Sequence, residues 1–231
     1  WLLSEKRRVV AWRLIVAGLL LQGLIAVLML KSPLFRQVFV GLNNVVLAFQ
    51  EATIAGTAFV FGYVGGGPLP FVETAPGGSF SLAFQALPLV LLIGALTALL
   101  YYWRILPRVV QCFSWGLQKT MGVGGALGVV ASGTVFLGMI EAPLLIRPYL
   151  QRLTRSELFA MMTVGLSCIA GTMLMLYASL LKGVIPDAFG HILTASIIHA
   201  PAALVLAAII IPETEPQTVG SEISRSEATS S

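Results

Sequence analysis

Charged residues are scarce in this chain: Asp, Glu, Lys and Arg make up 10% of its 231 residues, whereas hydrophobic residues make up 57%. The mean hydropathy is +0.91, and apolar runs of about 20 residues, the length that a helix needs to cross a bilayer, recur along the chain. A soluble domain of this length would carry many more charged side chains on its surface. The composition therefore excludes a soluble protein and predicts an all-α polytopic membrane protein.

Residues for metal or enzyme chemistry are also few. The chain has two cysteines and two histidines, and Cys112 and Cys168 have neither the spacing of a metal site nor that of a disulfide framework. Ser/His pairs and zinc-protease motifs do not occur, and no basic tract is suited to nucleic acid. We therefore expect no enzyme activity, no bound cofactor and no nucleic-acid partner.

The apolar runs predict about four transmembrane helices, at residues 9–30, 80–103, 159–181 and 191–211. Two further stretches, 34–64 and 106–121, mix apolar residues with polar ones and predict helices that lie along the membrane surface. Residues 212–231 are polar and rich in Ser, Glu and Thr, which predicts a disordered tail.

The segment from Gly122 to Leu150 is apolar but interrupted. Six glycines fall between Gly122 and Gly138, and Pro143 and Pro148 follow. One continuous helix is disfavoured there, whereas two half-length helices of a re-entrant hairpin fit, with the turn near residues 137–142. A second interruption, Ala170-Gly171, predicts local unwinding of the third span at residues 167–171.

Glu141 is the most informative residue, because it places a carboxylate at the predicted turn of the hairpin. A charged side chain at membrane depth costs roughly 2.5 to 3.5 kcal/mol on insertion scales, so it is retained where it faces a cavity or a partner. A site that binds substrate is the main hypothesis. The alternative is a carboxylate near the cytoplasmic interface that pairs with Arg147.

The basic residues indicate the orientation. If the amino-terminal cluster is cytoplasmic, eleven of the fourteen Lys and Arg residues fall on the cytoplasmic side, which is the bias of helical membrane proteins. We therefore expect a bacterial-type inner (plasma) membrane protein whose hairpin ends and carboxy-terminal tail are cytoplasmic. The residues on that side are Lys6, Arg7, Arg8, Arg13, Arg104, Arg108, Lys119, Arg147, Arg152, Arg155 and Arg225.

Three blocks occur in an order that resembles the concentrative nucleoside transporter family: Gly138-Met-Ile-Glu-Ala-Pro-Leu-Leu-Ile-Arg-Pro-Tyr149, Ser156-Glu-Leu-Phe-Ala-Met161 and Gly165-Leu-Ser-Cys-Ile-Ala-Gly171. Ile211-Pro-Glu-Thr-Glu215 extends the resemblance to most of the chain. It implies a homotrimeric, cation-coupled nucleoside symporter built from two inverted repeats. This chain resembles only the amino-terminal half.

The resemblance also implies site residues. Met139, Ile140 and Glu141 fall where family members bind the nucleoside, and only Glu141 keeps the family's residue. Thr134, Leu137, Cys168 and Ile169 fall at the family's sodium position. Carbonyl oxygens of Leu137 and Ile169 suit a hard cation, whereas the sulfur of Cys168 does not. Sodium and proton coupling both stay open, and Met139 and Ile140 favour apolar contact with the substrate.

We accordingly expect nucleoside transport by cation symport, with this chain as half of the transporter. The expected parts are a scaffold at 1–121, the first half of the transport core at 122–211 and the tail at 212–231. The alternative is a membrane assembly module that does not itself transport and that pairs with a separate half.

Overall fold

The computed structural model describes residues 4–6, 11–74, 78–181, 184–185, 188–215 and 218, and within these ranges it is helical. The α-helices are α1 Trp12–Lys31, α2 Pro33–Phe61, α3 Leu87–Tyr102, α4 Ile105–Met121, α5 Gly125–Thr134, α6 Glu141–Leu144, α7 Arg155–Ser167, α8 Gly171–Leu181 and α9 Ala188–Ile210. Short 3₁₀-helices cover Gly62–Gly65 and Arg147–Arg152, and a short π-helix covers Leu82–Ala86. The predicted all-α membrane class is confirmed.

Three of the four predicted spans are found as continuous or nearly continuous helices. The first is α1, the second is α3 with the preceding turn, and the fourth is α9. Residues 9 and 10 of the first prediction lie outside the described residues. The third span is divided: α7 ends at Ser167 and α8 begins at Gly171, so the predicted unwinding is confirmed.

The prediction for residues 34–64 needs correction. These residues form one 29-residue helix, α2, followed by a 3₁₀ turn. At about 1.5 Å per residue, α2 is longer than a bilayer core of about 30 Å. Five segments of the described chain, 40–65 among them, are long and apolar enough to cross a membrane, which is one more than predicted. The isolated polar residues Asn43, Asn44 and Gln50 are too few to offset the apolar run.

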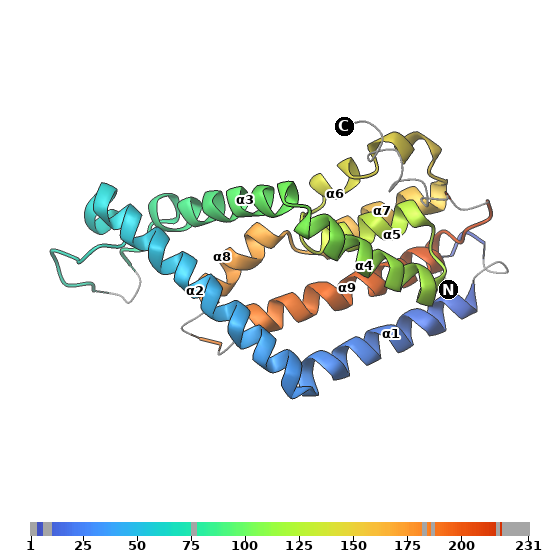
Figure 1. Cartoon of the computed structure of the whole chain (residues 1–231), viewed down its shortest axis with the longest axis horizontal. Helices are drawn as coiled ribbons and strands as arrows, with labels where there is room; N and C mark the ends of the chain where they lie inside the picture. Colours follow the sequence, from blue (N-terminus) through green and yellow to red (C-terminus); the bar gives the residue numbers. More distant parts are fainter. Residues whose placement is uncertain are drawn as a thin grey trace.

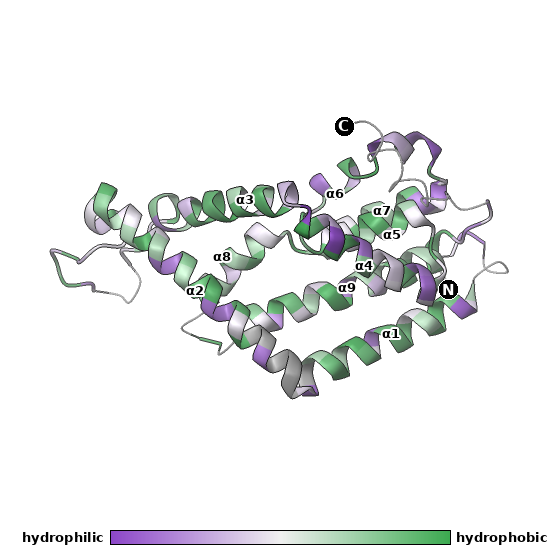
Figure 2. Cartoon of the chain, in the orientation of Figure 1, coloured by the Kyte–Doolittle hydropathy of each residue, from purple (hydrophilic) through white to green (hydrophobic). Residues whose placement is uncertain are grey.

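Helices α1 and α9 lie side by side, and α7 packs on α9 (Figure 1). The chain bends between α1 and α2 at Ser32-Pro33, so that the two helices form an open V (Figure 1), and α2 begins with proline in its first turn. Figure 2 shows α1 and α3 as mostly hydrophobic on the side in view, which is typical of helices that face lipid. Many apolar side chains of these helices are exposed, among them Leu20 at 69% and Leu91 at 74%.

Helix α4 agrees with the amphipathic helix predicted for residues 106–121. Its buried side chains recur every three or four residues, which places them on one face: Leu106, Val110, Ser114, Leu117 and Met121. That face packs on α5, the first arm of the hairpin. Ala126, Val130, Ala131 and Thr134 of α5 are completely buried, so this arm is the centre of the fold.

The hairpin is less regular than predicted. Its first arm is α5, but the second arm consists of the four-residue α6 followed by the 3₁₀ segment Arg147–Arg152. Pro143 and Pro148 explain this difference, because proline donates no backbone hydrogen bond and interrupts a regular ladder. A single half-length helix in this arm was therefore the wrong expectation.

The start of the predicted disordered tail is also ordered. We call residues 211–215 the strap, because hydrogen bonds hold them against the start of α7. Thr154 Oγ1 donates to Glu213 at 2.6 Å, and Ser156 Oγ donates to the Ile211 carbonyl at 2.7 Å. Thr218 Oγ1 donates to Glu157 at 2.6 Å. Residues 216–217 and 219–231 of the predicted tail lie outside the described residues.

Thr154 both caps α7 and holds the strap. Its Oγ1 accepts from the Glu157 amide at 3.1 Å, and Glu157 accepts from the Thr154 amide, which is a capping box. We predict that Thr154→Ala lowers the free energy of unfolding by about 1 to 2 kcal/mol, seen as a lower thermal midpoint of the purified complete protein.

Thr163→Ala is the matched control, because the Thr163 hydroxyl donates only to Phe159 within the same helix. The midpoint should change less in this variant. Equal midpoints for the two variants would contradict the double role of Thr154.

Candidate functional site

The predicted site lies where the turn of the hairpin meets the break between α7 and α8. Residues 135–140 connect α5 to α6, and Gly138 has a φ of +100°, a conformation that side chains other than glycine rarely adopt. The Leu137 amide still donates to Gly133 at 2.8 Å, and the Ala142 amide donates to Gly138 at 3.2 Å. The turn is therefore placed by hydrogen bonds on both sides.

The break itself covers residues 168–170. The Cys168 amide donates to Val164 at 3.1 Å, which is the last bond of α7, and the Leu174 amide donates to Ala170 at 2.9 Å, which begins the ladder of α8. Among the described backbone amides, none donates to the carbonyls of Cys168 or Ile169. Two carbonyl oxygens are thus available for other partners at this point.

One backbone hydrogen bond joins the turn to the break. The Gly171 amide donates to the Phe136 carbonyl at 3.0 Å, in place of a bond within its own helix. A Cβ at Gly171 would lie 2.6 Å from that carbonyl oxygen, and a Cβ at Gly138 would lie 2.9 Å from the Ala170 Cβ. Only glycine permits such close backbone approach.

Met139, Ile140 and Glu141 lie at the tip of the hairpin, and all three are exposed, Met139 by 53% and Ile140 by 70%. Met139 touches α7: its Cβ is 3.2 Å from where a Cβ at Gly165 would be. In the part of the chain that the structure describes, Glu141 and Arg147 form no ion pair. The pairing with Arg147 that the alternative hypothesis requires is therefore not found among the described residues.

Thr134, Leu137, Cys168 and Ile169 lie on the two segments that the Gly171 bond joins. Thr134 is fully buried, its hydroxyl donates to Ala131 at 2.9 Å, and it lies close to the Cys168 thiol. Cys168 Sγ is 4.0 Å from Ser167 Oγ and 3.8 Å from the Ser196 carbonyl oxygen. Of the predicted cation residues, Thr134 and Cys168 are therefore neighbours.

Ser167 and Ser196 also contact this cluster, and neither was predicted as a site residue from the sequence. Ser167 Oγ donates to Val164 at 3.0 Å, whereas Ser196 Oγ is buried and has no hydrogen-bond partner among the described atoms. Serine within an apolar run is common, so the sequence carries no signal that distinguishes these two residues.

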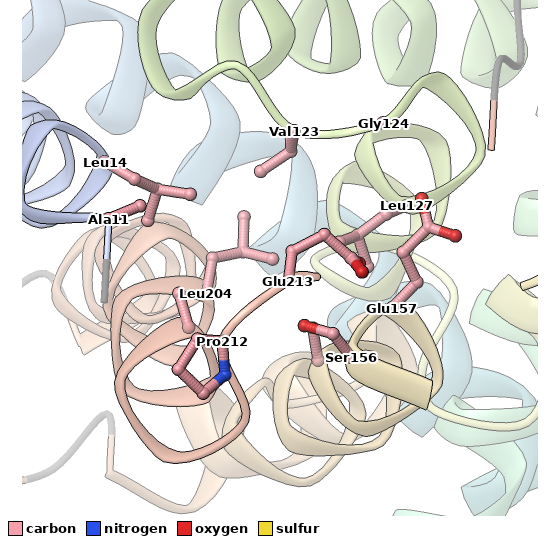
Figure 3. Close-up of a pocket in the computed structure, with 12 residues that line it drawn as sticks. Ala11, Leu14, Val123, Gly124, Leu127, Ser156, Glu157, Leu204, Pro212 and Glu213 are labelled. Carbon is pink, nitrogen blue, oxygen red and sulfur yellow. The ribbon is translucent and has the colours of Figure 1, made fainter. Parts of the chain in front are cut away.

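A separate cavity of about 100 Å³ lies at the other end of α7 and does not contain the predicted residues (Figure 3). Apolar walls from α1, α5 and α9 surround two carboxylates, Glu157 and Glu213, which approach from α7 and the strap. Glu157 is 2% exposed, and its oxygens accept from the amides of Thr154 and Thr218 and from the Thr218 hydroxyl. These bonds give Glu157 a structural role in holding Thr218, beyond the strap, against the start of α7.

The helices, the broken third span and the docked hairpin define a polytopic α-helical membrane protein with interrupted segments. Comparison with known proteins identifies the family. Residues 1–64 match the model of the Na⁺-dependent nucleoside transporter N-terminus, and residues 83–183 match the nucleoside recognition (Gate) model. The chain is homologous to the amino-terminal part of the sodium/nucleoside cotransporters, which confirms the resemblance.

Two relatives illustrate the extent of the match. The chain is 37% identical to sodium/nucleoside cotransporter 2 of Rattus norvegicus, over 92% of this chain and 30% of that protein. It is 36% identical to the uncharacterized transporter YutK of Bacillus subtilis, over 98% of this chain and 53% of that protein. The chain thus spans about half the length, or less, of the curated relatives that it matches.

Solved structures agree with this assignment. CNTnw in an inward-facing, substrate-bound state superposes with a TM-score of 0.84 and 31% identity, over 96% of this chain and 51% of that chain. A variant of CNTnw in an outward-facing state gives the same TM-score, identity and coverage. The fold of this half is therefore matched equally by both states.

A substitution tests the close approach of Gly171 to the Phe136 carbonyl. We predict that Gly171→Ala destabilises the complete protein by about 1 to 3 kcal/mol, because the added methyl meets a backbone carbonyl that cannot move freely. The thermal midpoint of purified protein measures this loss.

Gly94→Ala serves as the control, because a Cβ there meets nothing within 4 Å and alanine is the better helix former. Its midpoint should stay equal or rise. A Gly171→Ala protein as stable as Gly94→Ala would show that the turn and the break do not dock as described.

Proposed function

We propose that the complete protein containing this chain transports nucleosides across the membrane by cation symport, and that this chain supplies the first half of its transport core. The observation that carries this proposal is the exposed carboxylate of Glu141 on a glycine turn that docks against a broken helix. Transporters place substrate at such interruptions, because irregular backbone at membrane depth offers polar groups that a regular helix uses internally.

Glu141 is the proposed substrate residue, with Met139 and Ile140 as apolar neighbours. Its carboxylate can accept hydrogen bonds from ribose hydroxyls, and charge-assisted bonds of this kind are stronger than neutral ones. Met139 and Ile140 offer no hydrogen bond to a base edge through their side chains. They favour contact with the face of the base over recognition of its polar groups.

The proposed coupling ion is sodium, held between Thr134, Leu137, Cys168 and Ile169. Support comes from the free carbonyl of Ile169, the buried hydroxyl of Thr134 and the sodium dependence named in the matched family model. A hard cation prefers these oxygens to the Cys168 sulfur. Proton coupling is the alternative, and it predicts uptake that follows pH in place of sodium.

The proposed division keeps residues 1–121 as scaffold and 122–211 as the moving half-core, in a homotrimer of the inner membrane. Contacts at the chain's polar end support a common side for the amino terminus, the start of α7 and the strap. Arg155 pairs with Glu5 at 2.7 Å, and Lys6 Nζ is 3.5 Å from Thr214 Oγ1. We assign this side to the cytoplasm from the distribution of Lys and Arg.

Glu141→Gln tests the proposal in uptake-deficient cells that express the complete reading frame. We predict loss of labelled uridine and adenosine uptake by about 100-fold or more, because the amide keeps the shape of the side chain but loses the charge. Sodium replacement and a change of external pH in the same assay distinguish the two coupling ions.

Glu215→Gln is the control, since Glu215 is exposed on the strap and far along the chain from the hairpin. It should retain uptake at matched surface expression. Full uptake by Glu141→Gln, or no uptake by the well-expressed parent, would refute nucleoside transport through this hairpin. If the parent becomes active only when coexpressed with a separate second half, the half-length module is the correct alternative.

A further inference from the structure

Ser196 is an exception among the buried hydroxyls of this protein. It is 1% exposed, and its Oγ has no hydrogen-bond partner in the part of the chain that the structure describes. Two other buried hydroxyls in helices, Thr194 and Ser132, donate to a carbonyl one turn earlier, Gly190 at 2.7 Å and Gly128 at 2.8 Å respectively. A buried polar group without a partner is unfavourable and calls for an explanation.

The position of Ser196 gives an explanation for its unpaired hydroxyl. Its carbonyl oxygen accepts from Cys168 Sγ at 3.8 Å, which places this part of α9 directly against the break between α7 and α8. Helix α9 also contacts α5, the helix that ends at the fully buried Thr134. Ser196 therefore lies where α9 meets the break, and α9 forms a third side of the cluster that contains Thr134 and Cys168.

The chemistry of the cluster shows what is missing. Cys168 contributes sulfur, which is a poor ligand for a hard cation, whereas Thr134 still offers the oxygen of a hydroxyl whose proton is donated to Ala131. A hydroxyl oxygen has two lone pairs and suits such a cation. The free Ser196 oxygen is thus the kind of ligand that the cluster lacks on its cysteine side.

We propose that the Ser196 hydroxyl is an oxygen ligand of the coupling sodium ion, and that it compensates for the sulfur at Cys168. The inference rests on the proposed function, because it requires a cation between the turn and the break. It adds α9 to the elements that form the site. It also explains why a serine without a protein partner is kept in a tightly packed apolar helix.

Sodium-dependent thermal stabilisation of the purified complete protein tests this role without relying on transport. The titration compares the parent with Ser196→Ala, with choline replacing sodium at constant ionic strength. We expect Ser196→Ala to need about tenfold more sodium for half-maximal stabilisation, as losses of groups that support a metal site do. Without sodium it should be at least as stable as the parent, because an unpaired buried hydroxyl has been removed.

Ser114→Ala is the matched control: Ser114 is 2% exposed, but its Oγ accepts from Gln118 at 2.8 Å in α4. It should lose stability equally with and without sodium and keep the parent's sodium midpoint. Ser196→Cys is the second variant if Ser196→Ala does not fold, since it keeps a small polar side chain and removes only the oxygen. It should show the same rise in the sodium midpoint.

An unchanged sodium midpoint in Ser196→Ala or Ser196→Cys, beside a parent that does respond to sodium, overturns the assignment and leaves the proposed function intact. Equal destabilisation of Ser196→Ala with and without sodium also overturns it, and assigns the hydroxyl to a structural water. A parent that transports nucleosides but is not stabilised by sodium overturns both the sodium site and the role of Ser196. In that case proton coupling replaces sodium coupling.

Discussion

The backbone hydrogen bond from the Gly171 amide to the Phe136 carbonyl joins two segments that have each lost regular helical bonding. In a membrane, an interruption of this kind is tolerated only where protein or enclosed water satisfies the backbone groups. Here the Gly171 amide at the break in the third span donates to the Phe136 carbonyl at the hairpin turn, so one bond satisfies a backbone group on each side. Each interruption is thus stabilised by the other, and neither is explained by its own sequence alone.

The same docking separates the site into an exposed and a buried part. Glu141 is exposed at the tip, where a second half of a transporter or a substrate can reach it. Thr134 and Ser196 are buried, beside the half-buried Cys168, and an unpaired oxygen in a buried position has a strong preference for a ligand. A substrate at the tip and a cation below would therefore act on opposite sides of one glycine-rich contact. This arrangement gives coupling between them a physical route.

Sequence reasoning predicted the elements that depend on local signals. Glycine and proline spacing predicted the hairpin and the break at residues 167–171, and apolar length predicted α1, α3 and α9. It failed where tertiary contacts decide the outcome. The polar residues of α2 suggested a surface helix, and the polar residues of the strap suggested disorder, although Thr154 and Ser156 hold the strap in place. Ser196 could not be predicted from the sequence, because its distinguishing feature is a buried hydroxyl without a hydrogen-bond partner among the described atoms.

Contact between the hairpin tip and the broken helix is the central claim, and a disulfide cross-link measures it most directly. The Met139 Cβ lies 3.2 Å from a Cβ placed at Gly165, slightly below the separation of about 3.5 to 4.5 Å that a disulfide requires. The measurement is the cross-linked fraction, by mass spectrometry after mild oxidation, of Met139→Cys with Gly165→Cys in the complete protein. Cys112→Ser and Cys168→Ser form the background, and Met139→Cys with Gly94→Cys is the control pair. We predict that the first pair cross-links within each subunit and the control pair does not. A folded protein whose first pair stays reduced would contradict the docking of the hairpin against the broken helix.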